Sequence, residues 1–286
     1  MGIQWRFLCK ENRVTALLDI GAHISNNKTG QSQTGAGTTG RPVKTDDIFL
    51  SGLGEMQKKH PIIRMFHVYK RYGPKNALAD VSIDIDFNEW VFITGPSGAG
   101  KSTLLKLMYR GEIVSEGQIL VDGANLLRVA HGQIPLLRRK FGVIFQDFKL
   151  IQTKTAYENV ALVLEVAGVK PQLIRKKVHN VLRQAGMEDK MNQYPPSLSG
   201  GEQQRVAVAR AIVGDPRIIV ADEPTGSLDS RSAGIIMDLL KSYQSRGATI
   251  VIATHDRDML SKTNQRIIYL ENGRVLDHGV RADMGP

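Results

Sequence analysis

The chain has 286 residues, 42% of them hydrophobic and 23% charged, with a formal net charge of +10. This composition is ordinary for a globular protein and excludes a fibrous or wholly disordered chain. A single cysteine, Cys9, excludes an internal disulfide framework and fits a reducing compartment. No apolar run is long enough to span a bilayer, so we expect any membrane association to come through a partner or the surface.

The positive net charge is compatible with nucleic acid, anionic lipid headgroups or anionic small molecules such as nucleotides. An ordinary basic surface explains it equally well. The basic residues form short clusters, for example at residues 138–140 and 175–177, and no long tract is interleaved with aromatic residues. We therefore expect no nucleic-acid partner.

The first 60 residues differ in composition from the rest of the chain. Residues 25–40, SNNKTGQSQTGAGTTG, are almost wholly Gly, Ser, Thr, Asn and Gln. Such a segment buries too little apolar area to offset the entropy lost on ordering. We predict a flexible, disordered extension over residues 1–60 and a folded domain over residues 61–280.

Strands and helices are predicted in alternation after the extension. Apolar patterns predict strands over residues 63–69, 79–87, 89–94, 118–121, 141–145, 217–221 and 249–253. Helical patterns cover residues 102–109, most of 155–190, 199–213 and 230–245. Asn272-Gly273 predicts a hairpin turn between strands at 266–270 and 274–277. This order predicts an α/β fold with a mostly parallel sheet covered on both faces.

The strongest chemical signal is GPSGAGKST at residues 95–103, which matches the phosphate-loop pattern G-x-x-x-x-G-K-S/T. Its glycines let backbone N–H groups and a helix N-terminus face phosphate oxygens. Lys101 is expected to reach the β- and γ-phosphates of ATP, and Ser102 to bind Mg²⁺. A generic glycine-rich turn is the alternative, and the strand–helix context argues against it. The expected ATP contacts are Gly95, Pro96, Ser97, Gly98, Ala99, Gly100, Lys101, Ser102 and Thr103.

A second signal is the pair of carboxylates that ends the predicted strand IIVADEP at residues 218–224. Ligands of open α/β sheets bind at the carboxyl ends of strands. Asp222 is expected to hold Mg²⁺, and Glu223 to act as general base on the attacking water. An Asp-Glu pair alone is often a solvated loop, but here it accompanies a phosphate loop.

The third signal is LSGGEQQR at residues 198–205. Ser199 and Glu202 have the spacing of a helix capping box, and we expect that local role. The box does not explain the Gly200-Gly201 pair, which weakens the first helical turn. Two glycines there let a backbone or an anion approach, which indicates a second phosphate-binding surface. Since one nucleotide needs one phosphate loop, the two surfaces suggest a nucleotide shared between two chains.

These three segments together resemble the nucleotide-binding domains of ABC (ATP-binding cassette) transporters, over residues 62–278. The resemblance implies a P-loop NTPase fold with a RecA-like core, an antiparallel β-subdomain and a helical subdomain at about residues 147–200. Gln146 then matches the Q-loop residue that touches Mg²⁺ and water, Asp229 the D-loop, and His255 the switch histidine at the γ-phosphate. Tyr72 matches the aromatic residue that stacks on adenine.

The family resemblance also implies a head-to-tail homodimer. Lys101 and Glu223 of one chain would face Ser199 and Gly201 of the other across ATP, so that hydrolysis requires the closed dimer. Two alternatives from other classes are a soluble ABC ATPase acting on nucleic acid, which usually carries two cassettes, and an inactive cassette. The complete catalytic set (Glu223, His255, Gln146 and Lys101) argues against the latter.

Within the family, residues 97–107, 137–150 and 225–229 are most similar to the FtsE type of the FtsE, LolD and MacB group. This implies a peripheral subunit on the cytoplasmic face of the inner membrane, paired with an FtsX-like membrane protein in cell division. A lipoprotein-release or efflux ATPase is the alternative. FtsE-like chains usually begin near the first strand, so residues 1–60 are either a genuine tail or follow from an upstream start.

The membrane partner is expected to dock beside the Q-loop. Several large apolar residues follow Gln146, as expected for a docking groove. Phe148 and Leu150 are the sharpest candidates because they flank Lys149 in a predicted loop. Val160 is expected to pack in the helical core instead. The full set of candidates is Phe148, Leu150, Ile151, Tyr157 and Val160.

Overall fold

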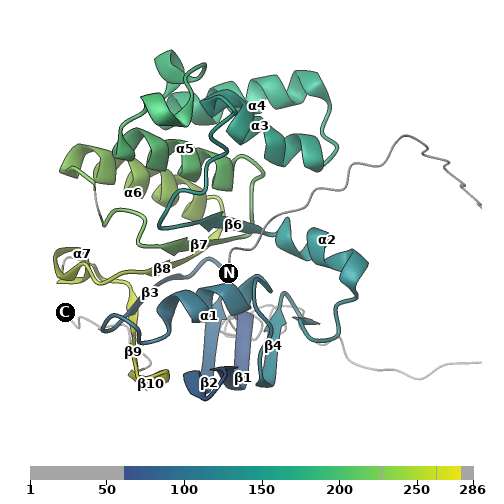
Figure 1. Cartoon of the computed structure of the whole chain (residues 1–286), viewed down its shortest axis with the longest axis vertical. Helices are drawn as coiled ribbons and strands as arrows, with labels where there is room; N and C mark the ends of the chain where they lie inside the picture. Colours follow the sequence, from purple (N-terminus) through teal and green to yellow (C-terminus); the bar gives the residue numbers. More distant parts are fainter. Residues whose placement is uncertain (1–60, 227, 262, 278–286) are drawn as a thin grey trace, which may run out of the picture. The chain divides into compact units, whose positions relative to one another are not determined.

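The computed structural model describes residues 61–226, 228–261 and 263–277. The predicted N-terminal extension and the last residues of the predicted 61–280 domain lie outside these ranges. A six-stranded sheet with the order β10-β9-β3-β8-β7-β6 is central to this part of the chain (Figure 1). The strands from β9 to β6 in this order are parallel, and β10 joins the edge antiparallel. Their bounds are β3 Trp90–Thr94, β6 Phe141–Ile144, β7 Ile218–Asp222, β8 Thr249–Ala253, β9 Arg266–Glu271 and β10 Arg274–Asp277.

Alternate residues of the sheet enter two separate hydrophobic cores. Phe92 and Ile219 belong to the core on the side of the later helices, whereas Val91 and Val220 belong to the core on the opposite side. This is the period of two expected of a strand, applied to a sheet that is buried on both faces. The predicted covered, mostly parallel sheet is therefore confirmed.

A second, antiparallel sheet with the order β2-β1-β4-β5 lies on the side of α1, below the central sheet in Figure 1. Its long hairpin strands and α1 share one core with the central sheet. This arrangement confirms the predicted antiparallel β-subdomain. The bounds are β1 Pro61–Tyr72, β2 Lys75–Asp86, β4 Glu116–Val121, β5 Ala124–Asn125 and α1 Lys101–Met108.

Helices cover the other face of the central sheet. Thr155 and Glu158 form a capping box at the start of α3, and Pro171 begins α4. Both helices fall within residues 147–200, the predicted helical subdomain, and lie above α5 and α6 in Figure 1. The bounds are α3 Ala156–Val166, α4 Pro171–Gln184, α5 Gly200–Ile212 and α6 Ser230–Gln244, with single 3₁₀ turns at Glu188–Lys190 and Pro195–Ser197.

Five short elements were not predicted: β5, the 3₁₀ turns at His131–Gln133 and Pro195–Ser197, α2 at Ile134–Arg138 and α7 at Arg257–Ser261. Segments of two to five residues are too short for a strand or helix period to appear in the sequence. No helix in the described ranges has the length and apolar character needed to cross a bilayer.

The predicted hairpin turn at Asn272-Gly273 is confirmed, with φ of 50° and 74° at the two residues. It also contacts distant parts of the chain. The backbone N–H of Gly273 donates to the Ala99 carbonyl at 3.0 Å, and the N–H of Ala79 donates to the Gly273 carbonyl at 2.8 Å. The turn therefore joins the phosphate loop to β2.

Candidate functional site

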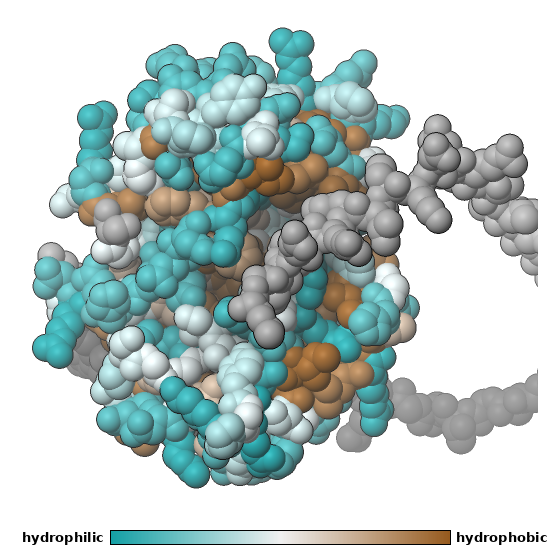
Figure 2. Space-filling view, viewed as in Figure 1, coloured by the Kyte–Doolittle hydropathy of each residue, from teal (hydrophilic) through white to brown (hydrophobic). Residues whose placement is uncertain are grey.

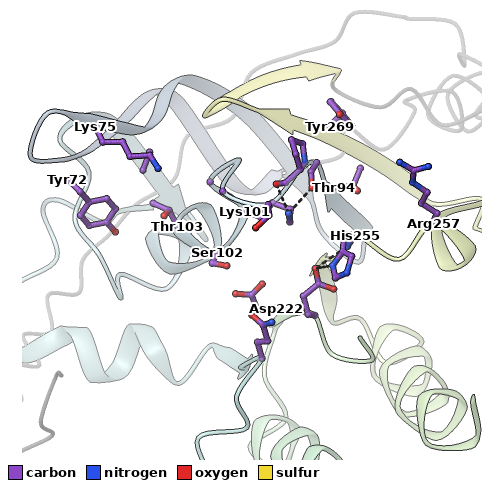
Figure 3. A pocket seen from close by; sticks show the side chains of 18 residues that line it. Tyr72, Lys75, Thr94, Lys101, Ser102, Thr103, Asp222, His255, Arg257 and Tyr269 are labelled. Carbon is purple, nitrogen blue, oxygen red and sulfur yellow. Dashed lines mark hydrogen bonds and ion pairs between the residues drawn. The ribbon is translucent and has the colours of Figure 1, made fainter. Parts of the chain in front are cut away.

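A pocket of about 800 Å³ opens where β3, β6, β7 and β8 end (Figure 3). The carboxyl ends of parallel strands meet at one edge of a sheet, so segments far apart in sequence converge there. Most of the predicted site residues line this pocket: Tyr72, Gly95, Pro96, Ser97, Gly98, Gly100, Lys101, Ser102, Thr103, Gln146, Asp222, Glu223 and His255.

The phosphate loop is packed so closely that Gly95 is obligatory. Its φ is +142°, and a Cβ there would lie 1.8 Å from the Leu270 carbonyl oxygen. Ala99 is buried in the core beneath the loop, and its side chain does not line the pocket. The shape of the loop therefore depends on contacts with β9, at the other end of the described chain.

Lys101 turns its ammonium group back into the loop. Its Nζ donates to the carbonyl of Gly95 at 2.8 Å and to that of Pro96 at 3.1 Å. No ion pair of Lys101 is recorded among the described residues. The positive charge therefore remains available to an anionic ligand in the pocket.

Asp222 and Ser102 form an oxygen pair suited to Mg²⁺. Burial raises the pKa of Asp222, the hydrogen bond from Ser102 opposes this rise, and the neighbouring Glu223 carboxylate adds to it. Proteins bind Mg²⁺ through one or two carboxylates together with phosphate oxygens and water. No group of three His, Cys, Asp or Glu side chains in the described ranges is placed to hold a metal. The residues present therefore suit a metal that shares its ligands with a nucleotide.

Both carboxylate oxygens of Glu223 are held in place. Thr254 Oγ1 donates to Oε2 at 3.0 Å, and the backbone N–H of His255 donates to Oε1 at 3.1 Å. His255 Nδ1 also lies 2.5 Å from Oε1. The Glu223 side chain is only 9% exposed, whereas that of His255 is 72% exposed. A histidine facing the pocket is thus joined to a nearly buried carboxylate whose orientation is fixed.

Tyr72 lies at the other end of the pocket, beside Lys75 (Figure 3). The residue is 44% exposed, and Lys70 Nζ lies 4.7 Å from the ring centroid. Partial burial raises the pKa of the phenol. An exposed aromatic ring at the pocket edge has the geometry needed to stack on a base.

Sequence reasoning missed several residues of the site. Thr254 holds Glu223 but belongs to no spaced pattern that would mark it. The other unpredicted residues come from neighbouring strands and loops and carry no common signature. They are Lys75, Ala77, Thr94, Arg257 and Tyr269.

The predicted contacts Ser199, Gly200, Gly201 and Asp229 do not line the pocket. Ser199 caps α5: its Oγ accepts from the N–H of Glu202 at 3.3 Å, and the Glu202 carboxylate accepts from the N–H of Ser199 at 2.9 Å. The expected capping box is therefore confirmed. Asp229 caps α6 by accepting from the N–H of Ser232 at 2.9 Å.

The two glycines at the start of α5 differ in their surroundings. A Cβ on Gly201 would lie 2.9 Å from Ser232 Oγ, so the chain itself excludes a side chain there. A Cβ on Gly200 would meet nothing within 4 Å, and the residue is exposed. Nothing in the described part of this chain therefore explains why position 200 is glycine.

The expected docking residues fall into two groups. Leu150 and Val160 are buried in the core that contains the helices, so the prediction that Leu150 faces a partner is wrong. Its loop turns inward and places this side chain against the helices. Phe148 and Tyr157 are partly buried against the same core, and Ile151 is also partly exposed. Phe148 remains the sharpest candidate.

Comparison with known proteins gives consistent similarities. A family model described as ABC transporter matches residues 78–226. The chain is 44% identical over 226 residues to the cell division ATP-binding protein FtsE of Bacillus subtilis, covering 78% of this chain and 99% of the relative. It is 42% identical over 219 residues to FtsE of Escherichia coli, covering 76% and 98%. A solved dimeric ATP-binding cassette in a post-hydrolysis state, bound to ADP and Pi, superposes with a TM-score of 0.71 at 38% identity, covering 75% of this chain and 97% of that one.

Proposed function

Because this chain belongs to the ABC transporter family of ATP-binding domains, we propose that two copies of it close head to tail around two ATP molecules. The chain is an FtsE-like ATPase. The closing motion would drive a conformational change in an FtsX-like membrane protein at the cytoplasmic face of the membrane during cell division. The similarity to FtsE relatives over almost their whole length supports this role.

One observation, the surroundings of Gly200, supports the proposed head-to-tail dimer. The exposed Gly200 lies at a helix N-terminus outside the pocket, and no residue in the described part of the chain requires a glycine there. A helix N-terminus favours anions, and a missing side chain permits close approach. A second copy that brings its bound ATP against α5 would explain both properties. The dimeric form of the similar cassette is consistent with this arrangement.

The predicted residues of the pocket then have distinct roles in hydrolysis. Lys101 exchanges the carbonyls of Gly95 and Pro96 for the β- and γ-phosphates, and Tyr72 stacks on adenine. Ser102, Asp222 and Gln146 would hold Mg²⁺. When bound, the metal supplies positive charge that neutralises the phosphate oxygens.

Glu223 would complete the reaction. The contacts from Thr254 and His255 fix its carboxylate, which accepts a proton from water as the water oxygen bonds to the γ-phosphorus. The bond to the β-phosphate oxygen breaks, leaving ADP and phosphate. His255 can also reach the γ-phosphate because most of its ring is exposed. Closure by the second chain would exclude bulk water.

The membrane partner would bind beside Phe148, in the loop after Gln146. A competing surface exists, because Figure 2 shows hydrophobic side chains over the part of the molecule where α2 and β4 lie. Exposed apolar residues in that part of the chain are Ile113, Leu127 and Leu136. The loop is preferred because it continues directly from a pocket residue.

Membrane copurification of two matched variants tests this assignment. Phe148→Ser should bind ATP normally but lose an FtsX-like protein from the purified complex. Leu136→Ser should retain both. The reverse result would move the docking site to the surface over α2. Copurification of the parent chain with a lipoprotein-release or efflux component would instead favour the LolD or MacB type of function.

A further inference from the structure

The loop after Gln146 contains two consecutive residues in the left-handed region. Phe148 has φ of 57° and Lys149 has φ of 52°, and neither is glycine. This conformation is disfavoured for residues that carry a Cβ, and two in succession need contacts that hold them. The loop therefore depends on an external support.

Arg210 of α5 provides that support. Its Nη1 donates to the Lys149 carbonyl at 2.6 Å and its Nη2 to the Phe148 carbonyl at 2.7 Å. Burial lowers the pKa of Arg210 to about 10, so the guanidinium stays charged at neutral pH. No ion pair of Arg210 is recorded in the described ranges. One planar fork therefore fixes the two strained peptides.

The pair of hydrogen bonds from Arg210 to the carbonyls of Phe148 and Lys149, called the clamp below, joins two functional parts of the molecule. Gln146, two residues before Phe148, lines the pocket, and Gly200 begins the helix that carries Arg210. A helix of this length is a stiff rod, with a rise of about 1.5 Å per residue. A displacement of α5 as a rigid helix would therefore reach the loop through Arg210.

We propose that Arg210 is a positioning residue that locks the loop at residues 147–149 to α5, so that movement of α5 on dimer closure sets the position of Gln146 in the pocket. The transmission step rests on the proposed function. The clamp itself is a property of the single chain, and it can be tested in the absence of nucleotide.

Four full-length chains test the clamp: the parent, Arg210→Met, Lys149→Gly and the double variant. Arg210→Met should lower the kcat for ATP hydrolysis by about tenfold to a hundredfold, as expected for a misplaced site residue, with KM changed less than about twofold. Deuterium uptake of residues 146–151 should rise without nucleotide. Glycine adopts φ near +50° without strain, so the double variant should regain about fivefold or more in kcat.

The control is Asn88→Gly, because Asn88 has φ of 57° in a turn that does not line the pocket. Combined with Arg210→Met, it should restore neither kcat nor protection of the loop. Recovery with Asn88→Gly would mean that Arg210 acts through general stability, which would overturn the proposal. A kcat of Arg210→Met within twofold of the parent would overturn it as well. Parental deuterium uptake in Arg210→Met would exclude the clamp, whether or not the chain forms the proposed dimer.

Discussion

Glycines lie at the start of two helices, Gly100 as the N-cap of α1 and Gly200 as the first residue of α5, and the two first turns are built in opposite ways. At α1, the N-cap Gly100 has no side-chain hydrogen bond, the first turn contains no acidic residue, and Lys101 is the first helical residue. At α5, Ser199 and Glu202 form a complete capping box, and Glu202 places a negative charge at the positive end of the helix. Of these two helices, α5 is therefore the one whose side chains accept hydrogen bonds from its N-terminal N–H groups.

This difference distinguishes a helix N-terminus that is suited to bind an anionic ligand from one that is already capped by side chains. A lysine at a helix N-terminus opposes the helix dipole, which costs typically about 0.3–1 kcal/mol. At α1 that cost is offset when an anion binds. The N-terminus of α5 is capped by side chains of its own first turn and leaves Ser199 and Gly200 exposed to another molecule. This difference fits the proposed dimer, in which the nucleotide binds at α1 of one chain and meets α5 of the other.

The largest effect is expected from Glu223→Gln, which leaves both helix N-termini intact but removes the base. The amide keeps the shape of the side chain and accepts protons poorly, so kcat should fall by about 10²–10⁴-fold. ATP binding should persist, and light scattering should detect an ATP-dependent dimer. ATPase activity within a few-fold of the parent, or a monomer at saturating ATP, would contradict the assignment.

Lys101→Ala should impair nucleotide binding at the N-terminus of α1 and leave the N-terminus of α5 unchanged. Loss of hydrogen bonds from a charged donor should weaken ATP binding by about tenfold to a hundredfold. The free energy of unfolding without nucleotide should change by less than about 1 kcal/mol, because relief of the dipole offsets the lost loop contacts. Ser199→Ala is the matched change at α5 and should cost about 0.5–2 kcal/mol of stability with little loss of ATP affinity. Calorimetry and chemical denaturation measure both quantities.

Gly200→Ala and Gly201→Ala sharpen the comparison within α5. Alanine at 201 must displace Ser232, so we expect a loss of about 1–3 kcal/mol in stability. A methyl group at 200 would meet no atom of the described residues within 4 Å, so alanine there should not lower stability. If a second chain docks there, the added methyl group should still lower kcat by about tenfold. Full activity of a stable Gly200→Ala chain would argue against the shared nucleotide.

The smallest effect is expected from removing residues 1–60. All predicted site residues lie from Tyr72 onward, so a chain beginning at Pro61 should keep its kcat within about twofold. Activity and thermal unfolding of the shortened chain test this expectation. Collapse of either would assign a structural role to the extension.

Local patterns predicted much of the fold and most of the pocket. The phosphate loop, Asp222 and the hairpin turn depend on short-range geometry that sequence reports directly. Gln146, His255 and Tyr72 came from the resemblance to ABC cassettes, and the structure places Gln146 and His255 after parallel strands that end at one edge of the sheet. The capping box was predicted because Ser199 and Glu202 are three residues apart in the sequence.

Long-range contacts were not predictable in this way. The two carbonyls that Arg210 holds are about sixty residues away in sequence, and no spacing relates them. Leu150 looked exposed because it follows a polar residue in a loop, whereas the left-handed turn at Phe148 and Lys149 directs the chain inward. Backbone reversals of this kind arise from tertiary support that a sequence window does not contain.

The contact between Gly273 and the phosphate loop has a consequence for the order of synthesis. All the catalytic signals are translated before residue 256, yet Gly95 packs on Leu270 and the Ala99 carbonyl is bonded by Gly273. A nascent chain that lacks the hairpin of β9 and β10 contains every predicted catalytic residue. It lacks the contacts from Leu270 and Gly273 that shape the phosphate loop. We therefore expect a nascent chain to bind nucleotide only after the hairpin of β9 and β10 has left the ribosome.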